Sequence, residues 1–145
     1  MIKYLLVVCI GNICRSPMAE ELLRQALPGR TIFSAGIGAL VGKPAEPNAI
    51  ELMAESGLDI SQHRAQQFTT VMAGHADLIL VMDSKQKHEI QRMHPSASGK
   101  IFRLGELDKF DIPDPYCQPR HAFEQALQLI QRGVDIWAPR VRALD

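Results

Sequence analysis

The sequence predicts a single α/β domain spanning residues 1–145, built as a doubly wound, four-stranded parallel sheet flanked by helices on both faces. Three observations lead to this prediction. Apolar runs of strand length alternate with segments of helical periodicity, no internal repeat or linker interrupts them, and the 46% hydrophobic content suits one globular core. Sheets of this kind place their ligands beyond the carboxyl ends of the strands.

The first third of the chain predicts a strand, a helix, a second strand and a loop. Residues 3–8 are apolar and β-branched, which favours a strand buried on both faces. Ser16-Pro17 begins a helix, because proline fits the first helical turn, and Pro28-Gly29 ends it. Residues 31–35 form the second strand, and residues 36–47, with several Gly and Pro residues, form a loop.

The middle of the chain repeats this alternation. Residues 48–56 have the periodicity of an amphipathic helix that stops at Gly57. Residues 77–82 are the third buried strand, and Asp83-Ser84 caps a helix that runs to His94-Pro95.

The last part of the chain contributes one strand and one long helix. Residues 100–104 predict a short fourth strand. The final helix begins near Pro119, and Pro139 is expected to end its apolar pattern. Trp137 lies on that apolar face and is expected in the core.

Composition excludes several classes of protein. Sixteen basic and sixteen acidic residues leave no net charge to attract nucleic acid or an anionic membrane. The apolar start of the chain is too short for a signal peptide or a membrane span. Three cysteines do not make a disulfide framework, so we expect a cytoplasmic protein with reactive rather than structural thiols.

The loop from Cys9 to Ser16 contains the chemistry. It connects a buried strand to a helix, so its backbone N–H groups can converge on one tetrahedral anion, and Gly11 and Asn12 tolerate the left-handed backbone that such a nest needs. The expected phosphate-binding groups are those of Ile10, Gly11, Asn12, Ile13, Cys14 and Ser16. For an isolated pair, Cys9 as a small buried hydrophobe and Arg15 as a surface cation would be the simpler interpretation.

Within this loop, Cys9 is the candidate nucleophile. The N–H groups, the helix N-terminus and the Arg15 guanidinium all favour its thiolate form. Arg15 offers two parallel donors to phosphoryl oxygens, a geometry that lysine cannot copy. Ser16 is expected to hydrogen-bond the sulfur and help it leave.

This loop, with Ser34-Ala35-Gly36 and Asp114-Pro115-Tyr116, closely resembles the low molecular weight protein tyrosine phosphatase family, essentially end to end. The resemblance implies a flavodoxin-like fold of the phosphotyrosine protein phosphatase I type. It implies that Cys9 attacks phosphorus, that Arg15 binds the phosphoryl group and that Asp114 protonates the leaving phenolate. It also implies that Asn12, Ser34 and His63 support the loop through hydrogen bonds.

The reaction independently requires an acid. Tyrosine has a pKa of about 10, and a positioned acid helps such a leaving group by roughly 100- to 10,000-fold. The same carboxylate can later activate water against the phosphocysteine. Without the resemblance, Asp108 and Asp111 would be candidates equal to Asp114.

The resemblance also bears on substrate and partner. Tyr116 is expected to stack on the substrate ring, with Leu40 on the opposite wall. Residues 38–43 look like the bacterial exopolysaccharide- or capsule-linked branch, which implies a phosphotyrosine protein, a tyrosine autokinase, as partner. We expect the enzyme to be a monomer. No metal or cofactor is required, because Arg15 and backbone donors supply the positive charge.

Two competing interpretations remain. An arsenate reductase of the same fold would need further cysteines near the third strand and its following helix, and residues 76–99 contain none. A phosphate-binding module or phosphocysteine carrier would not need Asp114.

Cys14 is a candidate for a reversible disulfide with Cys9, and Cys117 is expected to be a passive wall residue.

Overall fold

The computed structural model describes all residues 1–145 and contains one four-stranded sheet in the order β2-β1-β3-β4. All neighbouring strands pair in parallel, which confirms the predicted sheet. The strands are β1 (Tyr4–Cys9), β2 (Thr31–Gly36), β3 (Leu78–Val81) and β4 (Ile101–Arg103). The order reverses at β1, so the carboxyl end of β1 lies at the topological switch point where such sheets bind ligands.

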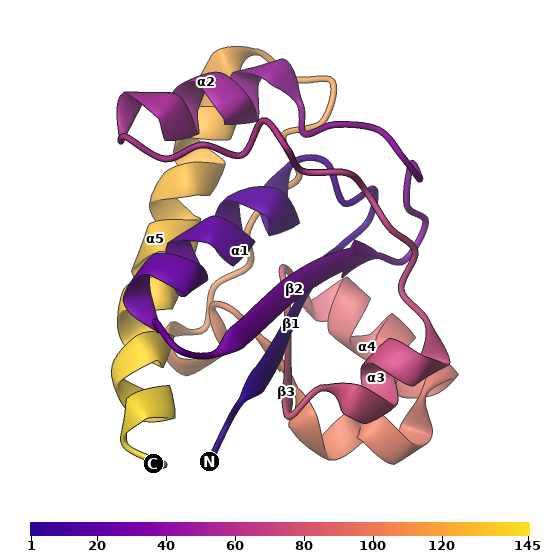
Figure 1. Cartoon of the computed structure of the whole chain (residues 1–145). Helices are drawn as coiled ribbons and strands as arrows, with labels where there is room; N and C mark the ends of the chain where they lie inside the picture. Colours follow the sequence, from indigo (N-terminus) through magenta and orange to yellow (C-terminus); the bar gives the residue numbers. More distant parts are fainter.

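Helices cover both faces of the sheet (Figure 1). One face carries α1 (Arg15–Ala26), α2 (Pro47–Glu55) and α5 (Arg120–Arg142), and the other carries α3 (Thr70–His75) and α4 (Ser84–Met93). Two short 3-10 helices, η1 (Pro95–Lys100) and η2 (Glu106–Asp108), flank β4. No helix is both long enough and apolar enough to cross a membrane.

Alternate residues of β1 build two separate cores, one under each helical layer. Leu5 and Val7 belong to the larger cluster with α1 and α5, whereas Leu6 and Val8 belong to the smaller cluster with α3 and α4. This two-sided burial explains why the strand is continuously apolar. It also holds Cys9, at the end of β1, on a rigid element.

Two sequence-based expectations about the helices were wrong. The helix α5 does not end at Pro139 but continues to Arg142. Proline removes one helical hydrogen bond, yet the buried side chains of Ala138 and Val141 hold the last turn against the core. The short helix α3 was not expected, and its signal is local: the Thr69 side chain accepts a hydrogen bond from the Met72 N–H.

Glu106 joins α4 to β4. Burial by itself would raise the pKa of this carboxyl group. Hydrogen bonds from Lys87 Nζ at 2.6 Å and from the Arg103 backbone N–H at 3.1 Å reverse the effect and lower the pKa to about 2.

We therefore predict a pH-dependent loss of stability in Glu106→Gln. Because the pKa is depressed from 4.5 in the folded protein, the stabilisation is fully present above 4.5 and disappears as the pH falls through about 2. Urea denaturation near neutral pH should show a loss of roughly 1–2 kcal/mol, after allowance for solvent screening. The difference in unfolding free energy between Glu106→Gln and the wild type should become smaller near pH 3, roughly midway between these pKa values. Glu89→Gln, on the α4 helix that also carries Lys87, is the control, and a pH-independent difference would contradict the prediction.

Candidate active site

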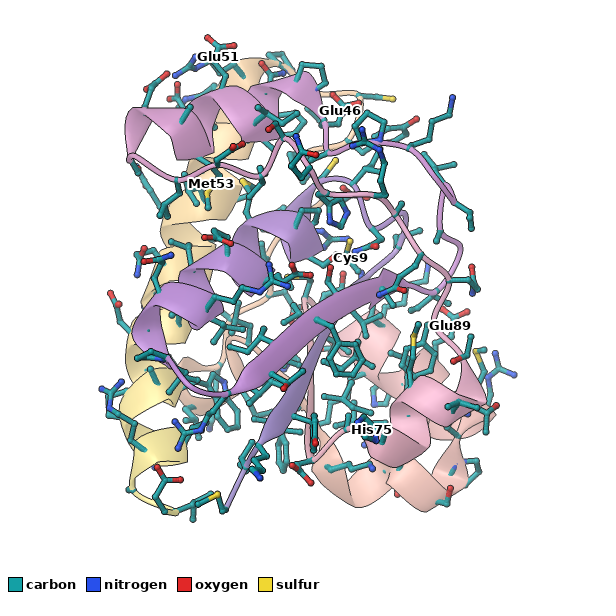
Figure 2. The ribbon with its side chains drawn as sticks, viewed as in Figure 1. Cys9, Glu46, Glu51, Met53, His75 and Glu89 are labelled. Atoms are coloured by element: carbon teal, nitrogen blue, oxygen red, sulfur yellow. The ribbon has the colours of Figure 1, made fainter.

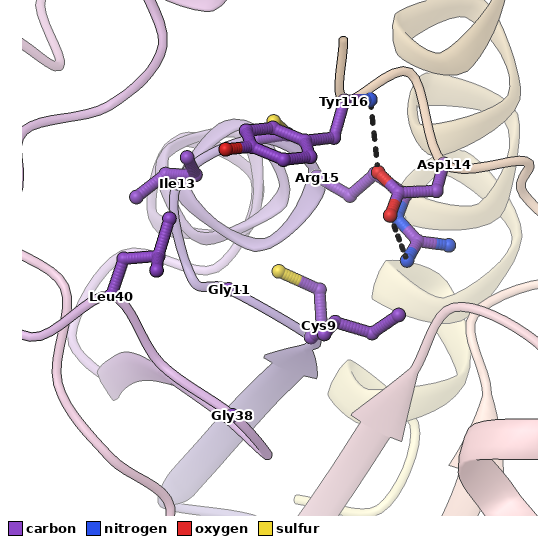
Figure 3. A pocket seen from close by; sticks show the side chains of 10 residues that line it. Cys9, Gly11, Ile13, Arg15, Gly38, Leu40, Asp114 and Tyr116 are labelled. Atoms are coloured by element: carbon purple, nitrogen blue, oxygen red, sulfur yellow. Dashed lines mark hydrogen bonds and ion pairs between the residues drawn. The ribbon is translucent and has the colours of Figure 1, made fainter.

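The loop of residues 9–15, here called the anion loop, connects the carboxyl end of β1 to the N-terminus of α1. Cys9 lies where the strand ends, beneath the start of the helix (Figure 2). Its side chain is directed into a pocket of about 150 Å³ (Figure 3). The residues lining the pocket are Cys9, Ile10, Gly11, Ile13, Cys14, Arg15, Gly38, Leu40, Asp114 and Tyr116.

The backbone of the anion loop is turned so that its carbonyl groups face outward. The carbonyls of residues 9–13 are each hydrogen-bonded to a neighbouring segment: Cys9 O to Ile37 N, Ile10 O to Gly38 N, Gly11 O to Leu40 N, Asn12 O to His63 Nε2, and Ile13 O to Glu46 N, at 2.6–3.1 Å. The backbone N–H groups of residues 10–14 have no acceptor within the protein. This arrangement leaves a ring of donors suited to one tetrahedral oxyanion.

Asn12 holds this conformation. Its φ is 59°, and its fully buried side chain donates to Ser16 Oγ at 2.7 Å and to Ser34 Oγ at 3.0 Å. Its Oδ1 accepts from the Gln66 N–H at 2.9 Å. Asn12 was expected to offer its N–H to phosphate and to support the loop through hydrogen bonds. Its side chain makes such supporting bonds, and its N–H has no acceptor within the protein.

Gly36 permits the close approach of β2 to the anion loop. A Cβ on this residue would lie 2.4 Å from the carbonyl oxygen of Ile10, a distance that backbone atoms cannot accommodate. The position therefore requires glycine.

The Cys9 sulfur is 2.9 Å from Ser16 Oγ and almost fully buried. Because Ser16 Oγ already accepts from the Asn12 amide, its own hydrogen is free to point at the sulfur. A hydroxyl that donates to Cys9 can stabilise negative charge on the sulfur when the sulfur leaves phosphorus.

Arg15 is 1% exposed, and the protein fixes its guanidinium in place. One nitrogen donates to the Ile112 carbonyl at 2.7 Å and lies 3.3 Å from Asp83 Oδ2, and the other lies 3.7 Å from Asp114 Oδ2. Arg15 Nε has no partner within the protein. A buried guanidinium with an unpaired donor beside a thiol is equipped to bind an anion.

Asp83 was singled out in the sequence only as a helix cap, and it does accept from Gln86 N at 2.8 Å. The structure adds its contact with Arg15, 68 residues away in the chain. No local pattern signals that contact. Asp83 and the Ile112 carbonyl are thus site residues that sequence reasoning missed.

Asp114 is the only one of the three candidate acids that lines the pocket. Its side chain is 39% exposed, and its Oδ1 accepts from the Tyr116 N–H at 3.1 Å. Asp108 instead pairs with Arg132, and Asp111 pairs with Arg103, both outside the pocket.

Tyr116 and Leu40 border the pocket on different sides of the Cys9 sulfur, and both are partly exposed at its mouth (Figure 3). Ser34 and His63 lie behind the anion loop, at hydrogen-bonding distance from Asn12. The structure thus brings all the candidate residues together around one loop.

The three cysteines are free. Burial, followed by the charges of Cys9 and Asp114, raises the pKa of Cys14, which keeps it a thiol beside Cys9. Cys117 is exposed, adopts a φ of 64° and does not line the pocket. The prediction that Cys117 forms a wall of the pocket was therefore wrong, since Tyr116 borders the pocket and the exposed Cys117 that follows it does not.

The fold and the site together define a class of protein: phosphatases with a parallel α/β fold in which a cysteine at the focus of an oxyanion nest attacks a phosphate ester. The family model described as low molecular weight phosphotyrosine protein phosphatase matches residues 4–144. The chain belongs to this family, and it is a protein-tyrosine phosphatase.

Individual relatives agree with this assignment. The chain is 65% identical over 144 residues to a probable low molecular weight protein-tyrosine-phosphatase, EpsP, of Ralstonia nicotianae, covering 99% of each chain. Among solved structures, Vibrio vulnificus Wzb in complex with benzylphosphonate is 42% identical, with a TM-score of 0.93 over 97% of this chain and 99% of that one. The YwlE arginine phosphatase of Geobacillus stearothermophilus is 32% identical, with a TM-score of 0.91 over 97% and 94%.

Proposed function

We propose that this phosphatase hydrolyses phosphotyrosine in two steps through a phosphocysteine on Cys9. The observation that carries the proposal is the pocket itself, in which a thiol, a fixed guanidinium and a carboxyl group face one space. Dephosphorylation of a protein tyrosine needs one group for each role: nucleophile, phosphate ligand and acid.

In the first step, the Cys9 thiolate attacks phosphorus, and an S–P bond forms as the bond from phosphorus to the tyrosine oxygen breaks. Asp114 gives its proton to that oxygen, so tyrosine leaves as a neutral phenol. The five loop N–H groups and Arg15 hold the three equatorial oxygens, whose charge they stabilise as the phosphoryl group flattens.

In the second step, water replaces the phenol. Asp114, now a carboxylate, takes a proton from this water while the water oxygen attacks phosphorus. The S–P bond breaks, inorganic phosphate forms, and the Ser16 hydroxyl stabilises the departing Cys9 thiolate. The enzyme returns to its starting state without a metal or a cofactor.

The mouth of the pocket supports selection of an aromatic phosphoester. Leu40 and Tyr116 offer apolar surface to a ring held between them, while the phosphoryl group occupies the anion loop below. Benzylphosphonate, the ligand of the similar Wzb, joins a phenyl ring to a phosphonate and has the same two parts.

For the physiological role, we propose a bacterial tyrosine autokinase that controls exopolysaccharide or capsule production as the protein substrate. Similarity to EpsP and Wzb supports this choice. We further propose that the enzyme works in the cytoplasm as a monomer, with residues 1–145 acting as one domain.

A panel of phosphorylated peptides tests the substrate class. We expect kcat/KM for phosphotyrosine to exceed that for phosphoarginine and phosphoserine by at least about 10- to 100-fold, because only the ring reaches both apolar walls. Phosphoarginine is included because a structural neighbour is an arginine phosphatase. A preference for phosphoarginine, or a single stoichiometric release of phosphate typical of a carrier, would contradict the proposal.

A further inference from the structure

The Leu40 wall of the pocket stands on a short segment, residues 37–43, here called the wall loop. The anion loop holds its inner edge through three hydrogen bonds, donated by the N–H groups of Ile37, Gly38 and Leu40. The far end is held by a pair of hydrogen bonds at 2.9 Å between residues 42–43 and Ala65.

The outer edge of the wall loop is held by one side chain. The Gln67 amide donates from Nε2 to the Ile37 carbonyl at 2.6 Å and accepts at Oε1 from the Ala39 N–H at 3.0 Å. One primary amide thus hydrogen-bonds the backbone on both sides of Gly38, a pocket-lining residue.

The backbone of Gln67 is itself anchored to the site. It forms a parallel bridge with Gly36, whose N–H donates to Gln66 O and whose carbonyl accepts from Phe68 N. The Gln67 side chain therefore connects a fixed strand end to the segment that carries the wall.

We propose that Gln67 is a positioning residue that sets the Leu40 wall and thereby the affinity for the ring of the substrate. The proposal rests on the function given above, in which Leu40 contacts the ring. Gln67 is exposed and does not line the pocket, so it acts only through the wall loop. Leu40 is 41% exposed, so packing contributes little to holding it.

Two parts of a ligand depend on different contacts here. The phosphoryl group depends on the N–H groups of the anion loop and on Arg15, and the Gln67 side chain makes no hydrogen bond to either. The ring depends on Leu40. A change at Gln67 should therefore weaken a ligand that has a ring and leave a bare phosphate unaffected.

Competitive inhibition of p-nitrophenyl phosphate hydrolysis measures ring binding and phosphate binding separately. In Gln67→Ala, the inhibition constant of benzylphosphonate should rise by about 3- to 10-fold, and that of inorganic phosphate should stay within about twofold. Gln67→Glu should behave like Gln67→Ala. It keeps the acceptor for the Ala39 N–H, but it replaces the donor to the Ile37 carbonyl with a second oxygen, which cannot donate. Gln25→Ala removes an exposed amide that hydrogen-bonds Glu21, outside the pocket, and it is the control.

A double-mutant cycle shows whether Leu40 is the intermediary. In a Leu40→Ala background, Gln67→Ala should change the benzylphosphonate constant by less than about twofold. Additive effects, parallel weakening of both ligands, or no change would each overturn the role of Gln67. If the wild type binds neither ligand and does not hydrolyse the ester, the proposed function fails instead.

Discussion

Replacing Cys9 with serine is expected to abolish hydrolysis of aryl phosphates, lowering kcat by roughly 10,000-fold or more. The anion loop favours a thiolate at this position, whereas a serine hydroxyl stays protonated and attacks phosphorus poorly. Initial rates with p-nitrophenyl phosphate at saturating concentration measure the loss.

The anion loop should survive this change, since its carbonyl hydrogen bonds and Arg15 do not involve the sulfur. Cys9→Ser should therefore still bind phosphotyrosyl protein and retain the phosphorylated autokinase proposed as substrate. Cys117→Ser, which alters an exposed thiol outside the pocket, should keep full activity. Substantial turnover by Cys9→Ser would exclude this thiol as the nucleophile.

Replacing Asp114 with asparagine should lower kcat by roughly 100- to 10,000-fold on phosphotyrosine. Asparagine can keep the hydrogen bond that Oδ1 accepts from the Tyr116 N–H, so the loop is preserved while the proton is lost. The loss should shrink for phenols that leave more easily, because a better leaving group needs less protonation.

A series of substituted phenyl phosphates measures this dependence. In the wild type, kcat should vary little with the leaving group, and in Asp114→Asn it should vary steeply. Asp111→Asn is the matched control, since Asp111 lies in the same segment and contacts Ser84 and Arg103 outside the pocket. An equal loss in both variants would contradict the role of Asp114.

The parts of this molecule that the sequence predicted are those with local signals. The β1 strand is continuously apolar because both of its faces are buried, and Pro17 marks the start of α1. Cys9 and Arg15 lie at the two ends of the short loop that connects β1 to α1. Such features need only the neighbouring residues.

The parts that escaped prediction depend on contacts between distant segments. The Asp83 carboxylate and the Ile112 carbonyl reach Arg15 from segments 68 and 97 residues away. Gln67 acts on the wall loop through side-chain hydrogen bonds to backbone, which leave no periodic signal. The end of α5 depended on burial of Val141, which outweighed the local effect of Pro139.

The central claim is that Cys9 carries the phosphoryl group during turnover. Rapid acid quenching of the enzyme with a phosphotyrosine peptide, followed by mass spectrometry, locates that group directly. We predict a phosphoryl adduct on Cys9 that forms within one turnover and is absent from Cys9→Ser. An adduct on another residue, or steady turnover in which water attacks the ester with no adduct at any time, would contradict the account.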